Sequence, residues 1–291
     1  MSEHRGIAKV VRSQDTLEGA GVHLKRVFGF GDTTLFDPFL LLDDFRSDNP
    51  AHYEKGFPWH PHRGIETITY MIDGQMTHGD SLGNSGTISA GDVQWMTAGS
   101  GIIHQEMPLG DKNGLMGGFQ LWANLPAAEK MTRPRYRDVT QRQIPRVVLE
   151  NNVTIRIVCG QYLDQSGPVQ DIFIDPSYLD IQMPANQTFK HATPRGHTVF
   201  AYVIDGQGVF DLKNSRDPAT ESLDTLANGT LALFEDGDHI AVMTQNHAVR
   251  FLLISGRPLK EPVAWQGPIV MNTREELQRA FEEYEAGTFI K

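Results

Sequence analysis

Short segments in which apolar and polar residues alternate recur along the whole chain. The clearest of them are rich in β-branched and aromatic residues, and glycine or asparagine follows each one. This pattern is typical of antiparallel strands joined by turns. These segments span residues 66–73, 118–123, 153–159, 198–205 and 249–255. The sequence therefore predicts an all-β protein.

One helix is expected, close to the C-terminal end. Thr273 and Glu276 have the spacing of a capping box, in which each side chain bonds the backbone N–H of the other residue. The apolar residues that follow recur at the spacing of one helix face: Leu277, Ala280, Phe281 and Tyr284. We expect this helix to cover a sheet.

An internal repeat divides the chain. Residues 63–75 (RGIETITYMIDGQ) and 195–207 (RGHTVFAYVIDGQ) share an Arg-Gly pair followed by a strand ending in Tyr-x-Ile-Asp-Gly-Gln. Further along each half, Gly91-Asp92 and Gly237-Asp238 open another apolar strand. Repeated strand patterns of this kind indicate two copies of one small β-barrel or double-sheet domain.

The division between the two copies is predicted from a charged, proline-containing stretch, 129–146, which has little hydrophobic periodicity and is interpreted as a linker. The expected domains are an N-terminal one over residues 1–135 and a C-terminal one over 136–291. A polar insertion in the second copy, roughly 213–228, is expected to be a surface loop.

The charge balance and the cysteine count exclude several classes of partner and site. There are 26 Lys plus Arg against 36 Asp plus Glu, a net charge of −10. This acidity argues against direct nucleic-acid binding or an anionic membrane as a partner. The single cysteine, Cys159, excludes an internal disulfide and a thiolate zinc cluster. No run of about 18 apolar residues occurs, and the first residues lack an apolar leader, so a cytoplasmic location is expected.

Histidine is concentrated in one region. Five of the eleven histidines lie between positions 52 and 104, and two of them form His60-Pro61-His62. Because side chains two apart on an extended segment share a face, both imidazoles can reach one ion. His104 and Glu106 have the same spacing. Two such pairs on neighbouring strands could place three imidazoles and one carboxylate around a metal.

The donor set restricts the metal. Nitrogen and oxygen ligands without sulfur suit Fe(II), Mn, Ni, Cu or Zn. Four ligands that leave positions open in an octahedral shell would admit a substrate oxygen and O₂. A closed structural zinc site is the competing interpretation, and it is disfavoured because a β-domain of this size needs no metal to fold.

The repeat provides an internal control for this metal site. The positions that the alignment matches to the four candidate ligands hold Ala192, Pro194, Arg250 and Leu252. Residues needed for the fold should occur in both copies, whereas metal ligands need not, so the control favours the ligand interpretation. Glu66 is an alternative carboxylate, because it follows His62 by four residues on the same strand face. Spacing alone does not choose between Glu66 and Glu106.

Other residues near these motifs are expected to be structural. Arg63 has a counterpart, Arg195, in the second copy, which favours a hydrogen-bonding role in the fold. Packing of the barrel wall is the expected role of Trp95 and Met96. His52 and His78 have no partner at ligand spacing and are interpreted as surface or core residues.

Taken together, these motifs resemble the pirin family of two-domain cupins. Thr97 stands where cupins usually carry proline and the interval before His104 is long, and both departures match pirins. The resemblance implies two tandem cupin domains, each a double-stranded β-helix (jelly-roll) barrel, with a short C-terminal helix. The segments that carry it are DPFLLLDDF (37–45), HPHRGIETITY (60–70), GDVQWMTAGSGIIHQEMP (91–108), QLWANLP (120–126) and EPVAWQGPIVMNTREEL (261–277).

The resemblance also implies a cofactor and an activity. It implies one Fe(II) per chain in the N-terminal cupin, held by His60, His62, His104 and Glu106, with Glu66 nearby and no metal in the C-terminal cupin. Some pirins open the ring of the flavonol quercetin with O₂ and release carbon monoxide. We therefore expect an iron-dependent dioxygenase with a small aromatic substrate and Glu106 as ligand and general base. The alternative is a redox-responsive regulatory protein that binds a transcription or metabolic partner protein.

Overall fold

The computed structural model describes residues 3–211 and 225–291, which form two compact units. The first barrel comprises Gln14–Gln143 together with Leu259–Lys291. The second barrel comprises the residues up to Ser13 together with those of Ile144–Pro258 that the structure describes. Each terminal segment is therefore part of the unit formed mainly by the other half of the chain, unlike the continuous halves 1–135 and 136–291 expected from the sequence.

The first barrel consists of a seven-stranded and a four-stranded antiparallel sheet. Met71, Met76 and Ile88, which come from both sheets, pack in one buried cluster. The seven-stranded sheet has the order β12 (Arg135–Val139), β9 (Val93–Thr97), β6 (Ile65–Asp73), β11 (Gly117–Asn124), β4 (Phe39–Asp44), β3 (Val22–Phe28) and β2 (Gln14–Glu18). The four-stranded sheet has the order β5 (Phe57–His62), β10 (Ile102–Leu109), β7 (Gln75–Asp80) and β8 (Ser85–Ser89).

The second barrel repeats this arrangement around a larger apolar cluster, which includes Ile155, Ile181 and Phe251. Its main path is β1 (Ile7–Arg12), β21 (Thr230–Phe234), β19 (Thr198–Val209), β23 (Val249–Gly256), β17 (Ser177–Met183), β14 (Thr154–Cys159) and β13 (Arg146–Val148). The remaining ladder strands are β18 (Thr188–Ala192), β20 (Thr225–Ala227) and β22 (His239–Met243), and β15 (Gln161–Tyr162) pairs with β16 (Gln165–Ser166). Of the expected insertion at 213–228, residues 213–224 lie outside the described residues, and β20 follows them.

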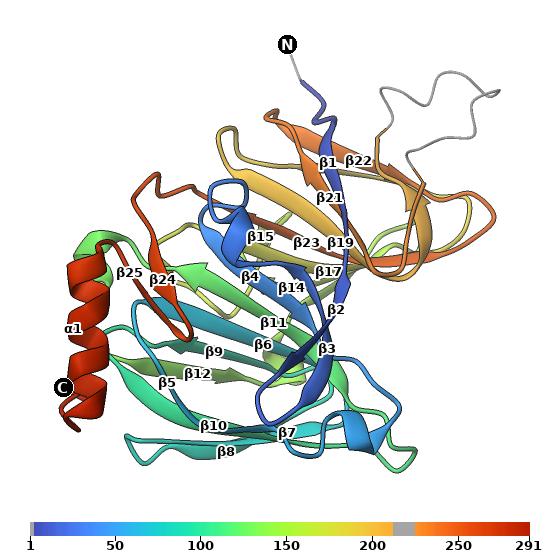
Figure 1. Cartoon of the computed structure of the whole chain (residues 1–291). Helices are drawn as coiled ribbons and strands as arrows, with labels where there is room; N and C mark the ends of the chain where they lie inside the picture. Colours follow the sequence, from blue (N-terminus) through green and yellow to red (C-terminus); the bar gives the residue numbers. More distant parts are fainter. Residues whose placement is uncertain (1–2, 212–224) are drawn as a thin grey trace. The chain divides into compact units, whose positions relative to one another are not determined.

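The internal repeat corresponds to equivalent strands in the two barrels (Figure 1). β6 lies between β9 and β11, and β19 lies between β21 and β23. The prediction of an all-β chain with two barrels is therefore confirmed. One part of the alignment is wrong, however. Gly91-Asp92 leads into β9, whose counterpart is β21, whereas Gly237-Asp238 leads into β22, the counterpart of β10.

The predicted helix is present as α1 (Arg274–Glu285), and its capping box is formed. The Thr273 hydroxyl accepts from the Glu276 N–H at 3.1 Å, and the Glu276 carboxylate accepts from the Thr273 N–H at 3.0 Å. The helix packs against a two-stranded ribbon, β24 (Ala264–Gln266) and β25 (Ile269–Met271), through a shared apolar cluster (Figure 1).

The interpretation of 129–146 as a linker is wrong for its central part. Arg135–Val139 forms β12, which pairs with β9 at the edge of the seven-stranded sheet. Its charged residues, Arg135, Arg137 and Asp138, interrupt the apolar alternation, and Tyr136 packs against an apolar cluster of the barrel. Edge strands commonly carry charged side chains that disfavour pairing with another chain, and such residues conceal the strand pattern here.

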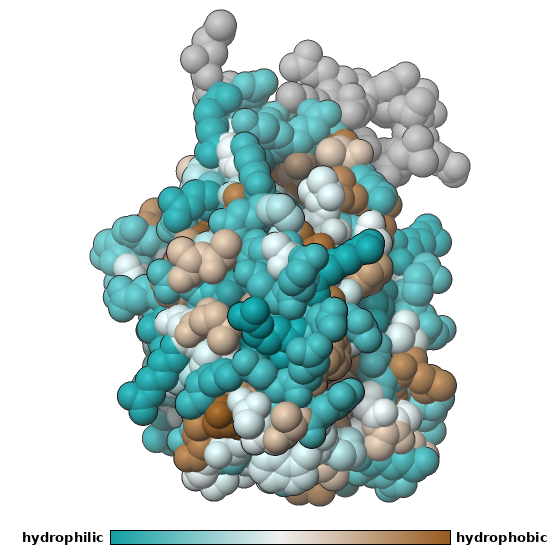
Figure 2. All heavy atoms as spheres, turned by 60° about the vertical axis from the view of Figure 1, so that its left-hand side comes forward, coloured by the Kyte–Doolittle hydropathy of each residue, from teal (hydrophilic) through white to brown (hydrophobic). Residues whose placement is uncertain are grey.

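The surface is largely hydrophilic. Hydrophilic residues cover most of the face drawn in Figure 2, and the hydrophobic ones form small separate patches. Within the described residues, α1 and the other helices are too short or too polar to cross a membrane.

Candidate metal centre

The two predicted ligand pairs lie on adjacent strands. β5 and β10 are antiparallel neighbours, and His60 is directly opposite His104 in their register. One ring nitrogen from each of His60, His62 and His104 lies within 4.8 Å of the others. His62 is 2% exposed and His104 is 1% exposed, so the group is largely shielded from water. The structure therefore brings together three of the four predicted ligands.

Backbone carbonyls set the orientation of two of these rings. His60 Nδ1 donates to the Pro58 carbonyl at 2.8 Å, and His62 Nδ1 donates to the Pro268 carbonyl at 3.1 Å. Because a carbonyl can only accept, each Nδ1 carries a proton, and Nε2 is the nitrogen that each ring presents to a ligand. The two Nε2 atoms are 3.1 Å apart. Two ring nitrogens that face each other at this distance are an arrangement that a cation between them would stabilise.

His104 completes the group. Its Nδ1 lies 3.4 Å from the Tyr136 hydroxyl, and its buried Nε2 has no hydrogen-bond partner among the described residues. A buried nitrogen without a partner is unfavourable unless a ligand satisfies it. Burial, reinforced by the neighbouring imidazoles, holds the pKa of His62 and of His104 well below the usual range. The neutral imidazoles that result are the form that binds metals, so these residues fit a metal ion.

Glu106 lies beside this group but apart from it. Its carboxylate accepts from Gln120 Nε2 at 3.3 Å and from the Thr69 hydroxyl at 3.3 Å. The Trp122 indole N–H donates to Gln120 Oε1 at 3.0 Å, which fixes the direction of that amide. The oxygens of Glu106 are not among the atoms that lie within 4.8 Å of one another. Its role as the fourth ligand stays a prediction.

Glu66, the alternative carboxylate, forms hydrogen bonds within the barrel wall. It is 1% exposed and accepts from Trp95 Nε1 at 3.1 Å and from Thr97 Oγ1 at 2.6 Å, so both of its oxygens bond side chains of β9. Burial raises the pKa of Glu66, although these hydrogen bonds oppose the shift. The buried Trp95 and Met96 form part of the wall, as expected.

The site opens onto a pocket of about 590 Å³ in the first barrel. His60, His62 and Glu106 lie among its lining residues, and most of the others are apolar or aromatic. Its rim includes Trp59, 53% exposed, and Phe30, 69% exposed. Aromatic walls around a few polar groups are typical of sites for small organic ligands.

Residues that sequence reasoning missed also shape this pocket. Gln120 and Thr69 hold Glu106, while Trp122, Trp265 and Pro268 contribute to the lining. Alternation along Gln120-Leu121-Trp122 places the first and third side chains on one face, which is a signal that the sequence already contained. Trp265 and Pro268 carried no such signal, because they come from a segment far along the chain.

The other singled-out residues have the expected structural roles. Arg63 donates to Glu283 at 2.7 Å and to the Phe289 carbonyl at 2.8 Å, which ties the C-terminal segment to the barrel. His52 stacks on His23, and the buried His78 stacks on Tyr136.

The second barrel has different side chains at the corresponding place. β18 and β22 are the counterparts of β5 and β10, and Ala192 pairs with His239 where His60 pairs with His104. The counterpart of His104 is therefore His239, and the match to Arg250 and Leu252 is wrong because both lie on β23, the counterpart of β11. Within the described part of this barrel, no group of three metal-binding side chains converges as in the first.

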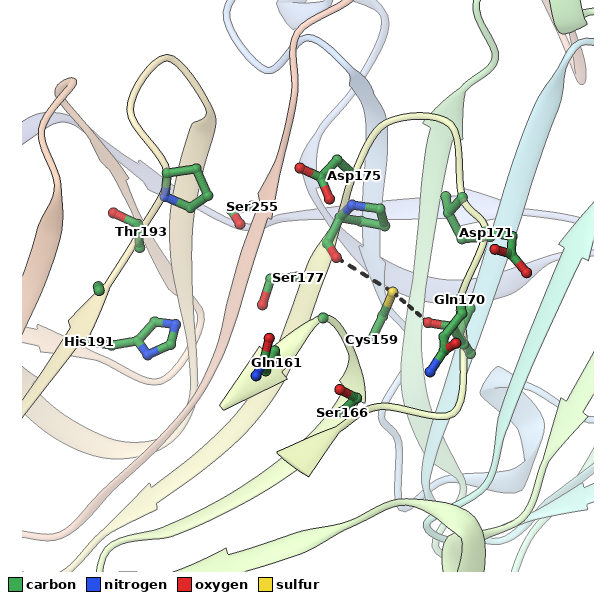
Figure 3. A pocket seen from close by; sticks show the side chains of 16 residues that line it. Cys159, Gln161, Ser166, Gln170, Asp171, Asp175, Ser177, His191, Thr193 and Ser255 are labelled. Carbon is green, nitrogen blue, oxygen red and sulfur yellow. Dashed lines mark hydrogen bonds between the residues drawn. The ribbon is translucent and has the colours of Figure 1, made fainter. Parts of the chain in front are cut away.

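The second barrel also has a pocket, of about 650 Å³ (Figure 3). Small polar and acidic side chains line it, among them Asp175, Ser177, Thr193 and Ser255. The buried Cys159 thiol donates to the Val169 carbonyl at 3.1 Å in its wall.

Two such barrels, with a histidine cluster in one of them, define a two-domain cupin. The Pirin family model matches residues 21–123, and the Pirin C-terminal cupin domain matches residues 178–290. A Pseudomonas aeruginosa protein provisionally named a quercetin 2,3-dioxygenase is 40% identical over 292 residues, covering 99% of each chain. The chain belongs to the pirin family.

Solved structures agree with this assignment. A quercetin 2,3-dioxygenase from Acinetobacter baumannii superposes with a TM-score of 0.86 at 30% identity, and 98% of each chain is covered. A bacterial pirin from Escherichia coli in complex with nickel(II) has a TM-score of 0.65 at 19% identity, covering 86% of this chain and 98% of that one. At that level of identity the second comparison concerns the fold.

Proposed function

We propose that the protein is a metal-dependent dioxygenase that opens the ring of a flavonol such as quercetin with O₂ and releases carbon monoxide. The observation that carries this proposal is the convergence of three imidazoles at a pocket whose lining includes several aromatic rings. The name of the Acinetobacter baumannii structure, a quercetin 2,3-dioxygenase, supports the choice of substrate.

The proposed ligands are His60, His62, His104 and Glu106, and the proposed metal is one Fe(II) per chain, with Mn, Ni, Cu or Zn as other ions that suit these donors. When bound, the metal would act as a Lewis acid that lowers the pKa of the flavonol hydroxyl and would offer positions to a substrate oxygen and to O₂.

The chain's own residues prepare the site. The carbonyls of Pro58 and Pro268 accept from Nδ1 of His60 and His62, so each ring presents its Nε2 to a metal. Gln120 and Thr69 hold the Glu106 carboxylate through its oxygens. Glu106 takes up the proton of the flavonol hydroxyl as general base. The aromatic lining binds the flat rings and excludes water from them.

The test is to load the protein with Fe(II) under anaerobic conditions and add quercetin and air. We expect one O₂ consumed and one carbon monoxide released for each quercetin lost. Metal-replete protein that releases no carbon monoxide from any of several flavonols would contradict the proposal. If that protein instead captured a partner protein according to the oxidation state of its iron, the regulatory alternative would replace the enzyme.

A further inference from the structure

Three aromatic side chains form one wall of the pocket in the first barrel. The Phe30 and Trp265 ring centroids are 5.5 Å apart, and those of Trp265 and Trp122 are 5.9 Å apart. Trp122 in turn lies 5.0 Å from the His62 ring. The aromatic wall, meaning Phe30, Trp265 and Trp122, therefore leads from the exposed rim to the histidine cluster.

The polar edges of both indoles are already used within the protein. Trp122 Nε1 donates to Gln120 Oε1 at 3.0 Å, and Trp265 Nε1 donates to the Gly267 carbonyl at 2.7 Å. A ligand against this wall consequently meets no free indole N–H, while Arg26 and Gln120 also line the pocket. Such a surface favours stacking with a planar aromatic group over hydrogen bonding.

The ribbon that carries Trp265 is fixed to the barrel a few residues away. The Val270 N–H donates to the Arg63 carbonyl at 3.1 Å. The ammonium group of Lys130, a residue only 2% exposed, donates to the Val270 carbonyl at 2.9 Å and to the Gly64 carbonyl at 2.8 Å. Because these bonds hold the base of the hairpin, the Trp265 ring is presented in a defined position, as a binding platform requires.

The same hairpin turn reaches the metal centre. Pro268, three residues after Trp265, supplies the carbonyl that accepts from His62 Nδ1. One short turn therefore orients a proposed ligand and presents an aromatic face beside it. A flat ligand against the aromatic wall would direct one edge toward the histidine cluster.

We infer that Trp265 determines specificity in this pocket by stacking on the flat ring system of the substrate and selecting planar over non-planar compounds. This inference rests on the proposed function for the choice of a flavonol as ligand. It assigns a role in the first barrel's site to a residue of the segment that the sequence placed in the other domain.

The experiment compares the Kd of metal-loaded protein for quercetin, which is planar, and for its dihydro derivative, in which saturation of the central ring removes the planarity. Measurements without O₂ exclude turnover. Trp265→Ala is expected to raise the quercetin Kd about 10-fold and that of the dihydro compound less than about 2-fold. Trp265→Phe keeps an aromatic face and should stay within about 3-fold of the wild type.

Gln266→Ala is the matched control, because Gln266 is adjacent to Trp265 in the chain but its side chain does not line this pocket. Both Kd values should therefore be unchanged in this variant. Metal content and Tm are measured for each variant. A wild type without preference for quercetin, or a preference that survives in Trp265→Ala, would overturn the inference. If the protein prefers quercetin and loses that preference in Trp265→Ala but turns over no flavonol, only the dioxygenase proposal is contradicted.

Discussion

The two barrels share a strand order and differ in what they place at equivalent positions. In the first, β5 and β10 bring His60, His62 and His104 together. In the second, β18 and β22 place Ala192 opposite His239. The second barrel has an extensive buried apolar cluster around the same framework, and its described residues form no such histidine group. The comparison teaches that the fold does not depend on the histidines, which leave a buried nitrogen unsatisfied in the first barrel.

The pockets differ in the same sense. Aromatic rings contribute much of the lining of the first barrel's pocket, whereas the second barrel's pocket is lined mainly by small and polar side chains and by no Phe, Tyr or Trp among the described residues. Duplicated strands thus keep their apolar interiors, while the residues near the strand ends determine the chemistry of each pocket.

The largest expected effect is a difference in metal binding and turnover between variants of two histidines that occupy equivalent positions in the two barrels. His104→Ala should reduce metal affinity by more than about 100-fold and flavonol turnover by about 1000-fold, since it removes one of three converging imidazoles. His239→Ala in the second barrel should change neither. Metal content by elemental analysis and carbon monoxide release check both variants, and equal losses would remove the distinction between the barrels.

The next contrast concerns two buried carboxylates of the first barrel. Glu106→Gln should lower turnover about 100-fold because the proposed base is lost. Glu66→Gln should instead lower the free energy of unfolding by about 1–2 kcal/mol, because one of the donors from β9 then faces an amide NH₂. Turnover and urea unfolding are measured on both. A Glu66→Gln variant that loses its metal while Glu106→Gln keeps it would reverse the two roles.

The repeat also provides two arginines whose surroundings differ. Arg63 is 2% exposed and bonds Glu283 and the Phe289 carbonyl, so Arg63→Ala should lower the free energy of unfolding by about 2 kcal/mol. The Arg195 side chain is 50% exposed and pairs with Glu3 and Asp238, so Arg195→Ala should cost less than about 0.5 kcal/mol. Chemical denaturation provides both values, and similar losses would argue that the shared Arg-Gly motif has one common role.

The last contrast concerns pH and the metal-free protein. His62 and His104 have pKa values well below 6.5, chiefly because of burial, so the unfolded chain binds more protons than the folded one as pH falls below 6.5. Stability is then complete above pH 6.5 and decreases toward acid, by about 1 kcal/mol per group over the first pH unit.

The control for this pH effect lies in the second barrel, where burial lowers the pKa of His191 to about 4. The free energy of unfolding is measured at pH 7.5 and 5.5, and its decrease toward acid should be smaller in the double variant His62→Gln/His104→Gln than in the wild type. His191→Gln measures how much of this decrease comes from the second barrel. If the decrease in the free energy of unfolding at acid pH is unchanged in the double variant, the neutral state of the two imidazoles is contradicted.

Local pattern predicted the strands, the capping box of α1 and the His-x-His face, because each depends on residues close together in the chain. It did not predict that β1 pairs with β21, or that the ribbon carrying Trp265 and Pro268 borders the histidine pocket. Such pairings join residues more than 100 positions apart and leave no periodic signal. The error at Arg250 has the same origin, since only the strand order shows that Gly237-Asp238 leads into β22 and not into the counterpart of β9.

The central claim is that only the first barrel holds a metal. The most direct test is a crystal structure of iron-loaded protein with an anomalous difference map at the iron edge. We expect one peak for each chain, among His60, His62 and His104, with Glu106 turned toward it. A map without a peak there, or with an equal peak beside Ala192 and His239, would contradict the account.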